Sequence, residues 1–246
     1  MKYKKKRCDN LLVLGGFVED LDTARRLIMA GKVRNTSDSV VSKASEKFLE
    51  DTEFIVDDKH SFVSRSAAKL KGALDKYVDD LSNMVCLDIG ASTGGFTEVM
   101  LRKNAAKVYA VDVGTGLLHY KLRTDERVVV LEGINARHLS EKEIPEKGDI
   151  LSCDVSFISL KTILPAVNPF LKKGAWAFTL IKPQFEAEKK DVPHGGIIID
   201  KKLQQKIVNE INLFAKDRLN WTLIETVTSP VKGTKGNQEF VSVFRK

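Results

Sequence analysis

The stretch "CLDIGASTGGFTEVM", residues 86–100, decides the fold that we predict for this chain. An apolar strand over residues 84–89 runs into a glycine-rich turn, and a helix follows over residues 95–102. Glycines let a backbone approach a ligand closely, and the N-terminus of a helix offers free N–H groups. A strand, a glycine turn and a helix in this order indicate a ligand site at the edge of a parallel sheet.

The spacing of glycines and acids favours S-adenosylmethionine over a dinucleotide as that ligand. A dinucleotide site prefers G-x-G-x-x-G, which wraps a pyrophosphate. Here Gly90 begins a G-x-x-x-G-G pattern, and Asp88 lies two residues before it. S-adenosylmethionine has an ammonium and a carboxylate, which suit an acid and free N–H groups. Asp112 ends the next expected strand, where a carboxylate accepts both ribose hydroxyls. A structural turn without a ligand is the alternative interpretation.

Strands alternate with helices over residues 64–246, which predicts an α/β fold with a doubly wound, Rossmann-like sheet of seven strands. The expected strands are residues 84–89, 107–113, 128–131, 149–153, 175–181, 221–226 and 239–244. The expected helices are residues 64–76, 95–102, 160–170 and 200–217. No helix separates the last two strands, so we expect the final strand to be antiparallel, an order typical of class I methyltransferases.

The sequence pattern over residues 1–58 predicts a small, separate α+β unit. Residues 59–63 are expected to link it to the larger part. Apolar residues at helical spacing indicate helices over residues 11–17 and 21–30. Short apolar pieces at residues 40–41 and 53–56 indicate strands.

Composition narrows the class of protein. The net charge of +7 is a mild bias toward polyanions such as RNA, although simple solubility explains it equally well. Cys8, Cys86 and Cys153 are far apart, with no CxxC pair and no Cys/His cluster, so we expect reduced thiols and no metal site. No apolar stretch reaches the roughly 18 residues of a membrane span, and no signal peptide follows the basic start. These features predict a cytoplasmic protein without integral membrane association.

Four ionisable residues fall at the predicted ligand edge of the sheet. Asp154 and Lys182 each follow an apolar strand, Lys69 lies in the helix before the first strand, and Glu239 begins the last strand. A ribose hydroxyl must lose a proton as it attacks a methyl group, and a lysine amine accepts one only when its pKa lies well below about 10.4. Burial and a second nearby cation both lower the pKa of a lysine. Taken singly, Lys69 and Glu239 are better explained as surface charges.

These residues carry a resemblance to a known family. The blocks "FVSRSAAKL", "LDIGASTGGFTEVM", "YAVDVG", "CDVSFISL", "LIKPQFEA" and "SPVKGTKGNQEF" follow in order and cover nearly the whole chain. They resemble the FtsJ-like RNA 2′-O-methyltransferases, most closely the TlyA type, which is also labelled hemolysin A. A series of six blocks is far more specific than any one of them.

The resemblance implies an S-adenosyl-L-methionine-dependent transfer of a methyl group to a ribose 2′-hydroxyl of rRNA, with cytidine as the modified nucleotide. It implies a Lys-Asp-Lys-Glu catalytic tetrad at Lys69, Asp154, Lys182 and Glu239. The implied cofactor contacts are Asp88, Gly90, Ala91, Ser92, Gly94, Gly95, Phe96, Asp112, Val113 and Asn135. The expected partner is therefore rRNA or a ribosomal subunit.

The resemblance also implies that residues 1–58 form an αL RNA-binding domain, similar to the one in ribosomal protein S-four. This part departs from the family pattern, because "RCDNLL" replaces Arg-Leu-Asp, Leu21 replaces an arginine, and "RNTSDS" replaces a Val-Asn-Gly turn. The remaining candidates for RNA contacts are Arg7, Arg25, Arg26, Lys32, Arg34 and Arg65.

Other functions stay open from the sequence. "DVSF" at residues 154–157 is faintly similar to the motif of amino-methyltransferases that stack a flipped base, but both prolines are missing. Cys153 would suit carbon-5 methylation, although a buried cysteine that ends a strand is ordinary. A cytolytic haemolysin lacks support, since the sequence has no long amphipathic membrane helix. A non-catalytic RNA-binding protein on the same scaffold is the third alternative.

Overall fold

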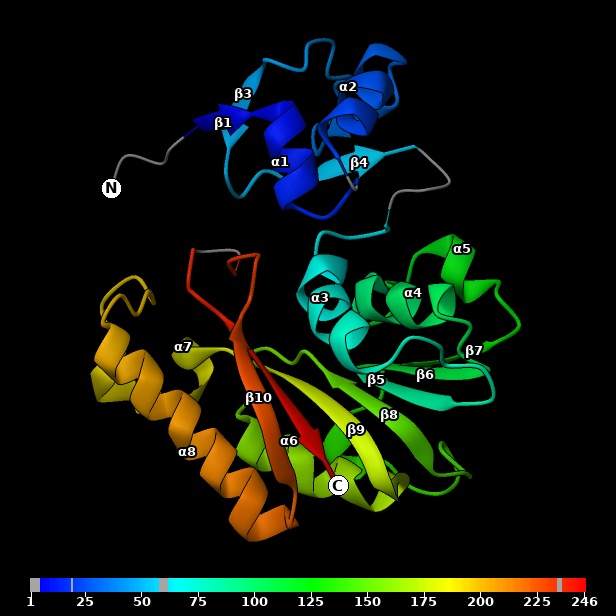
Figure 1. Cartoon of the computed structure of the whole chain (residues 1–246), viewed down its shortest axis with the longest axis vertical. Helices are drawn as coiled ribbons and strands as arrows, with labels where there is room; N and C mark the ends of the chain where they lie inside the picture. Colours follow the sequence, from blue (N-terminus) through cyan, green and yellow to red (C-terminus); the bar gives the residue numbers. More distant parts are fainter. Residues whose placement is uncertain (1–4, 19, 58–61, 234–235) are drawn as a thin grey trace.

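A computed structural model describes residues 5–18, 20–57, 62–233 and 236–246, and it contains one large mixed sheet (Figure 1). The predicted linker at residues 59–63 falls mostly outside the described residues. In spatial order, the sheet consists of β10 (Thr222–Thr228), β11 (Phe240–Arg245), β9 (Leu171–Ile181), β8 (Gly148–Cys153), β5 (Val85–Ile89), β6 (Lys107–Asp112) and β7 (Val128–Glu132).

The sheet confirms the predicted mostly parallel arrangement of seven strands. Strands β7, β6, β5, β8 and β9 pair in parallel, and β11 is antiparallel to both of its neighbours. β11 inserts between β9 and β10, with Phe240 opposite Ile181. Because β10 and β11 are joined by a loop without a helix, β11 has to run back along β10.

Helices cover both faces of the sheet. One face packs against α3 (Ala67–Tyr77), α4 (Gly95–Arg102) and α5 (Tyr120–Arg123). The other packs against α6 (Leu160–Val167) and α8 (Lys201–Leu219). Side chains alternate between these cores along each strand, so Cys86 faces the first core and Leu87 the second. Parallel strands with two covered faces read as continuous apolar runs, which explains why the sequence reveals them clearly.

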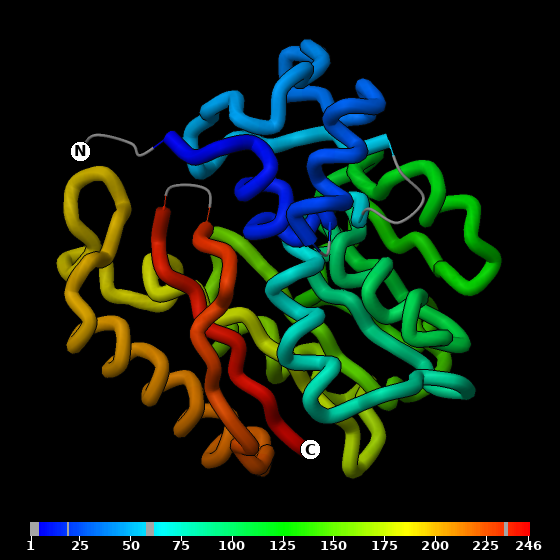
Figure 2. Tube along the Cα trace, turned by 45° about the horizontal axis from the view of Figure 1, so that its top comes forward, coloured from blue at the N-terminus to red at the C-terminus, as the bar shows by residue number. Residues whose placement is uncertain are grey.

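The N-terminal unit has its own small core and lies above the large sheet in Figure 1. Its helices pack around Leu12, Ile28 and Phe54. Its elements are β1 (Lys5–Arg7), α1 (Cys8–Leu14), α2 (Leu21–Met29), β2 (Val33–Asn35), β3 (Lys47–Leu49) and β4 (Phe54–Val56). Figure 2 shows this unit next to the start of α3, where the larger part begins.

Several predicted elements differ from the structure. The first helix begins at Cys8 rather than at residue 11, and residues 40–41 form only an isolated bridge from Val40 to Arg34. The helix expected over residues 160–170 ends at Val167 and continues as the 3-10 helix η2 (Asn168–Phe170), whose first turn contains a proline. Three-residue strands such as β1 and β3 are too short to show a period-two pattern, so the sequence did not reveal them.

Short elements complete the larger part. These are the 3-10 helices η1 (Ala136–His138) and η3 (Lys189–Asp191) and the short helix α7 (Pro183–Glu186). In the part of the chain that the structure describes, no helix is long and apolar enough to cross a membrane. The carboxyl ends of β5, β6, β8 and β9 carry the residues considered next.

Candidate active site

Four charged side chains meet in one cavity at the carboxyl ends of β8 and β9. The Nζ of Lys182 lies 2.6 Å from Asp154 Oδ1 and donates a hydrogen bond of 2.8 Å to the Ser156 hydroxyl. The Nζ of Lys69 lies 2.6 Å from Glu239 Oε2 and 3.8 Å from Asp154 Oδ2. Asp154 therefore lies between the two lysines, and the four residues proposed as a tetrad form one connected cluster of alternating charge.

Each member of the cluster is held by a different element. Lys69 projects from the first turn of α3. Lys182 follows β9 directly, and Pro183 begins α7 at the position where a missing N–H costs nothing. Pro183 thus starts a short helix directly after Lys182. Glu239 precedes β11 and packs against Gly233, where an added Cβ would lie 2.4 Å from Glu239 Oε1.

The cavity around this cluster has a volume of about 530 Å³. Two of its buried acceptors, Asp154 Oδ1 and Glu239 Oε2, are each engaged by a lysine amine at 2.6 Å. The buried Gln184 Oε1 has no hydrogen-bond partner among the described residues. Buried polar atoms are normally hydrogen-bonded, so this oxygen is an acceptor that a ligand in the cavity can reach.

The glycine turn after β5 lies directly against the charged cluster. Gly90 has a φ of +83°, and an added Cβ there would lie 2.3 Å from the carbonyl oxygen of Asp154. Ser92 also adopts a positive φ, of +50°. Only glycine fits the first of these positions, because both the space and the backbone conformation exclude a side chain. The turn and Asp154 are therefore fixed relative to each other.

The other predicted residues of this turn have distinct positions. Ala91 and Phe96 line the cavity of the charged cluster. Gly94 packs against Leu118 and against Leu122 of α5, and Gly95 packs so tightly on Ser66 that an added Cβ would lie 2.1 Å from its hydroxyl. Gly95 therefore lets the N-terminus of α4 lie against the start of α3.

Asp88 lies below the turn. Its side chain lines neither the cavity of the charged cluster nor a second cavity, described below, that opens beside it. Its carboxylate is fully buried and accepts hydrogen bonds from Thr97 Oγ1 at 2.6 Å and from Ser152 Oγ at 2.8 Å. Burial raises the pKa of Asp88 to about 6. In this structure, the carboxylate connects β5, α4 and β8 and supports the turn from beneath.

A second cavity, of about 400 Å³, opens beside the first at the ends of β5 and β6. Asp112 accepts hydrogen bonds of 2.8 Å from the backbone N–H groups of Ser92 and Gly114. Asn135 and the exposed Val113 lie along the same wall. The two cavities share the lining residues Gly90, Ser92, Asp154, Ser156 and Phe157.

The residues in the second cavity suit an adenosine. Its walls are largely apolar, with Ile89, Val111 and Ile134 among them, which fits the faces of a purine ring. Each carboxylate oxygen has two lone pairs, so Asp112 retains acceptor capacity for ribose hydroxyls while it holds Ser92 and Gly114.

Residues 62–246 match the family model described as FtsJ-like methyltransferase. The chain belongs to the FtsJ-like methyltransferase family. The match includes all four members of the charged cluster and both cavities.

Relatives of this FtsJ-like chain match over almost its full length. Hemolysin A of Brachyspira hyodysenteriae is 41% identical over 97% of this chain and 99% of its own length. The 16S/23S rRNA (cytidine-2′-O)-methyltransferase TlyA of Mycobacterium tuberculosis is 41% identical over 96% of this chain and 88% of its own length. A solved structure of a Streptococcus thermophilus protein named as a hemolysin is 38% identical, with a TM-score of 0.75, and covers 99% of this chain and 89% of its own.

More distant structures share only the fold with this FtsJ-like chain. An S-adenosylmethionine dependent methyltransferase from Mesorhizobium loti is 12% identical, with a TM-score of 0.52, over 73% of this chain and 98% of its own. It supports the Rossmann-like assignment of the large sheet.

Sequence reasoning missed three residues at the mouth of the FtsJ-like site. Ser156 contacts Lys182, as described above, and Phe157 is 90% exposed with a φ of +63°. The rings of Phe157 and Phe185 are 4.8 Å apart, and the Nζ of Lys182 lies 5.9 Å from the centre of the Phe185 ring. The signal for Phe157 was the "DVSF" block at residues 154–157, whose faint similarity to a base-stacking motif points to an exposed aromatic.

The cations predicted to contact RNA fall into two groups. Arg7 and Arg25 both pair with the buried Asp9, and Arg34 pairs with Asp38 at 3.1 Å. The Arg7 guanidinium holds the pKa of Asp9 below its usual range. Within the described part of the chain, no ion pair involves the other three, which are Arg26, Lys32 and Arg65. Arg65 alone among the six lines the cavity of the charged cluster.

Proposed function

We propose that this protein is an S-adenosyl-L-methionine-dependent rRNA 2′-O-methyltransferase of the TlyA type. The observation that carries the proposal is the position of Asp154, which touches both lysines and borders both cavities. A methyl donor in one cavity and a ribose in the other would meet at this residue. The relative from M. tuberculosis, whose name states this activity, supports the same substrate.

Lys182, Asp154, Lys69 and Glu239 act as the catalytic tetrad in this proposal. The Lys182 amine, in its neutral form, accepts the proton of the 2′-hydroxyl. Asp154 and the Ser156 hydroxyl fix the direction of that amine. Glu239 holds Lys69 close to Asp154, so the Asp154 carboxylate lies between two lysine amines. Positioning of this kind supplies much of the rate of an in-line displacement.

When bound, S-adenosyl-L-methionine supplies the methyl group. Asp112 would accept its ribose hydroxyls and Asn135 would lie near its adenine. The glycine turn, from Gly90 to Phe96, would hold the amino-acid end. Asp88 contributes through the shape of this turn, because its carboxylate is occupied by Thr97 and Ser152.

The N-terminal unit is proposed to act as an αL RNA-binding domain that delivers rRNA to the cavity. Arg26, Lys32 and Arg65 remain available for phosphates, whereas Arg7, Arg25 and Arg34 are engaged in ion pairs. Phe157 offers an exposed ring at the cavity mouth, on which an unstacked base would rest. Cytidine is the proposed target nucleotide, and the cytoplasm, where ribosomes are made, is the proposed location.

The test is methyl transfer from labelled S-adenosylmethionine to ribosomal subunits taken from cells that lack this gene, followed by mapping of ribose methylation. We expect a new 2′-O-methyl group on a cytidine. Lys182→Ala should abolish the transfer while calorimetry still shows cofactor binding. A modified base would favour base methylation, and absence of cofactor binding would favour a non-catalytic RNA-binding protein. Full transfer by Lys182→Ala would contradict the tetrad.

The name hemolysin, which several relatives carry, has a direct test as well. Purified protein with Lys182→Ala should not differ from the unmodified protein toward red cells, because neither should lyse them. Lysis by both would reveal a cytolytic activity independent of methyl transfer.

A further inference from the structure

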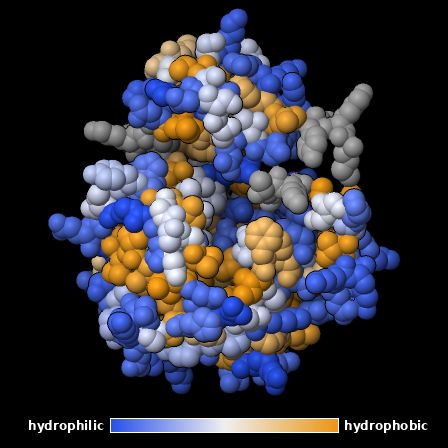
Figure 3. Space-filling model, turned by 180° about the vertical axis from the view of Figure 1, so that it is seen from behind, coloured by the Kyte–Doolittle hydropathy of each residue, from blue (hydrophilic) through white to orange (hydrophobic). Residues whose placement is uncertain are grey.

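A third cavity lies between the N-terminal unit and the methyltransferase part, and methyl transfer as proposed gives it no role. We call it the junction cavity; its volume is about 230 Å³. It shares Arg65, Lys232 and Gly233 with the cavity of the catalytic cluster, so the two are continuous. Figure 3, from behind, shows a recess between the two parts of the molecule with hydrophilic residues in it.

One wall of the junction cavity is apolar. Leu11 and Phe17, both nearly buried, come from the N-terminal unit, and Val231 faces them from the loop before β11. Leu14, the last residue of α1, also lines the cavity and is 50% exposed. A half-exposed leucine beside buried apolar side chains provides a surface on which a flat, weakly polar ring can pack.

The charges of the junction cavity are divided between its two ends. On the side of the N-terminal unit, Lys6 pairs with Glu50 at 3.1 Å, and Asp51 lies next to it. At the end shared with the catalytic cavity, Arg65 and Lys232 have no ion pair among the described residues. A phosphate is therefore attracted to the shared end, while the acidic residues repel it from the other.

Residues next to the cavity walls are tightly packed. Gly16, between the lining residues Gly15 and Phe17, lies against α3, where an added Cβ would be 2.5 Å from the Cβ of Ala68, the neighbour of Lys69 in the chain. On the opposite side, the N–H of the lining residue Gly233 donates to the Asn237 carbonyl at 2.9 Å, and the Asn237 side chain accepts from the Ile198 N–H at 2.9 Å. These contacts hold both walls close to the charged cluster.

We propose that the junction cavity binds the nucleotide next to the target in the RNA strand. This inference rests on the proposed function. The phosphate that links the two nucleotides lies between Arg65 and Lys232, and the neighbouring base packs against Leu14. Such a subsite requires single-stranded RNA, because only unstacked bases can enter a cavity of this kind. It fixes the register of the strand, so the target ribose faces Lys182.

The test measures RNA affinity separately from methyl transfer. We would compare Lys232→Ala, Leu14→Asp and the unmodified full chain for binding of a short, fluorescent, single-stranded RNA of mixed sequence at several salt concentrations. Lys232→Ala should weaken binding about tenfold and lower the slope of log affinity against log salt by about 0.7, the value for one lost phosphate contact. Lys232→Arg should restore both quantities. Leu14→Asp should weaken binding by a similar factor.

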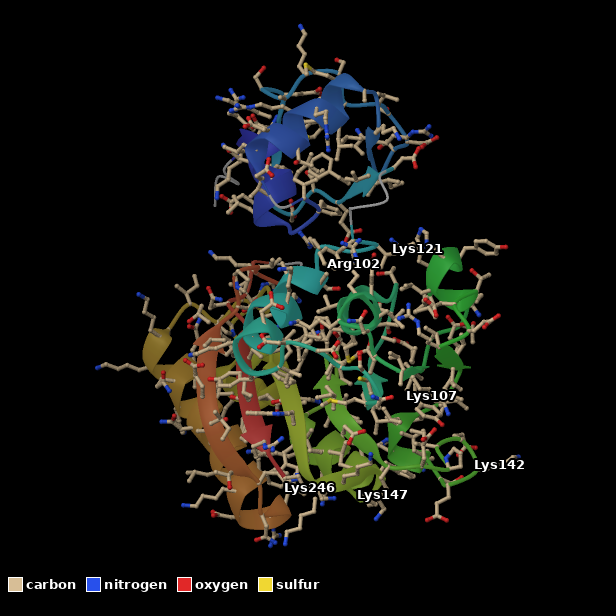
Figure 4. All side chains as sticks on the ribbon, turned by 45° about the vertical axis from the view of Figure 1, so that its right-hand side comes forward. Arg102, Lys107, Lys121, Lys142, Lys147 and Lys246 are labelled. Atoms are coloured by element: carbon tan, nitrogen blue, oxygen red, sulfur yellow. The ribbon has the colours of Figure 1, made fainter. Side chains whose placement is uncertain are left out.

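Matched controls are Lys142→Ala and Leu213→Asp. Lys142 is an exposed lysine at the end of the molecule opposite the N-terminal unit (Figure 4), and Leu213 is an exposed leucine of α8. Both should bind RNA like the unmodified chain. With ribosomal subunits as substrate, Lys232→Ala should raise KM about tenfold with kcat changed less than about threefold.

Equal RNA affinity and equal salt slopes in all variants would overturn the subsite, even if methyl transfer proceeds normally. The subsite would also be overturned if Lys142→Ala and Leu213→Asp lost as much RNA affinity as Lys232→Ala and Leu14→Asp. If the unmodified chain transfers no methyl group but Lys232→Ala still shows the smaller salt slope, the proposed function fails while the subsite stands.

Discussion

Asp88 and Asp154 stand at the ends of neighbouring parallel strands, yet their surroundings have little in common. Asp88 lies inside β5, beside Ser152 in the register of the sheet, and its buried carboxylate accepts hydrogen bonds from the hydroxyl groups of Thr97 and Ser152. Asp154 lies one residue beyond β8 and contacts two lysines in an open cavity. The shift from inside a strand to just past its end separates a carboxylate that supports the turn from one that lines a cavity.

The largest difference should appear when each acid is replaced by its amide. Asp154→Asn removes the charge that orients Lys182, so kcat for methyl transfer should fall about 10³-fold, equivalent to about 4 kcal/mol. Asp88→Asn should change kcat less than about threefold. Single-turnover assays with ribosomal subunits give both values. Similar losses in the two variants would show that Asp88 also faces the reacting groups.

The second prediction concerns the cost of an unpaired charge in the open cavity. Lys69→Met leaves Glu239, which is 2% exposed, without its cation. The free energy of unfolding in urea should fall by about 3 kcal/mol, since a buried carboxylate loses its partner. The double variant Lys69→Met/Glu239→Gln serves as the control and should recover at least half of that loss. If Lys69→Met is as stable as the unmodified protein, water solvates the Glu239 carboxylate well enough to replace Lys69.

The third prediction uses the raised pKa of Asp88. Its pKa is about 6 in the folded state, above the ordinary value of about 3.8, so the folded state keeps a proton that the unfolded state releases between these pH values. Stability from this group is therefore greatest at low pH and declines as pH rises toward about 6. From about pH 4.5 to about pH 7, the unmodified protein should lose about 2 kcal/mol more than Asp88→Asn in urea unfolding. Parallel curves would contradict the raised pKa.

The smallest effect tests the close contact between the glycine turn at Gly90 and the backbone of Asp154. Gly90→Ala places a Cβ against the Asp154 carbonyl and should raise the Kd for S-adenosylmethionine about tenfold, which calorimetry can measure. Gly116→Ala has a similar positive φ but nothing within 4 Å of the added Cβ, so it controls for backbone strain alone. If both variants bind the cofactor equally well, the close approach of Gly90 to Asp154 is not required.

The sequence predicted the large sheet and the positions of Asp154 and Lys182 because they follow from one rule, whereas Lys69 and Glu239 joined the tetrad through the family resemblance. Apolar runs mark buried parallel strands, and polar residues at their carboxyl ends meet at one edge. The same rule does not say which way a strand-end side chain points, so Asp88 and Asp112 read alike although one supports the turn and the other borders a cavity. Side chains of β5 alternate between the two faces of the sheet. Which face α4 covers, and therefore that Asp88 lies beneath Thr97, is known only from the packed structure.

Contacts between distant segments could not be predicted. Glu98 is an example, because its buried carboxylate accepts the Val63 N–H at 2.6 Å and pairs with Arg102 and Lys121, whose positions Figure 4 shows. In the sequence it reads as an ordinary charge on α4. Its role depends on how the segment before α3 crosses that helix, which no local pattern specifies. The ion pairs that engage Arg7 and Arg25 through Asp9 escaped prediction for the same reason.

The insertion of β11 between β9 and β10 has a consequence for biosynthesis. Of the strands in the large sheet, β11 leaves the ribosome last, yet its slot lies between two strands made earlier. Until it arrives, β9 and β10 have no shared partner, and Glu239, at its start, cannot reach Lys69. Pairing across so many intervening residues is slow. The ion pair between Lys69 and Glu239 can therefore form only after β11 has been made and has entered its place between β9 and β10.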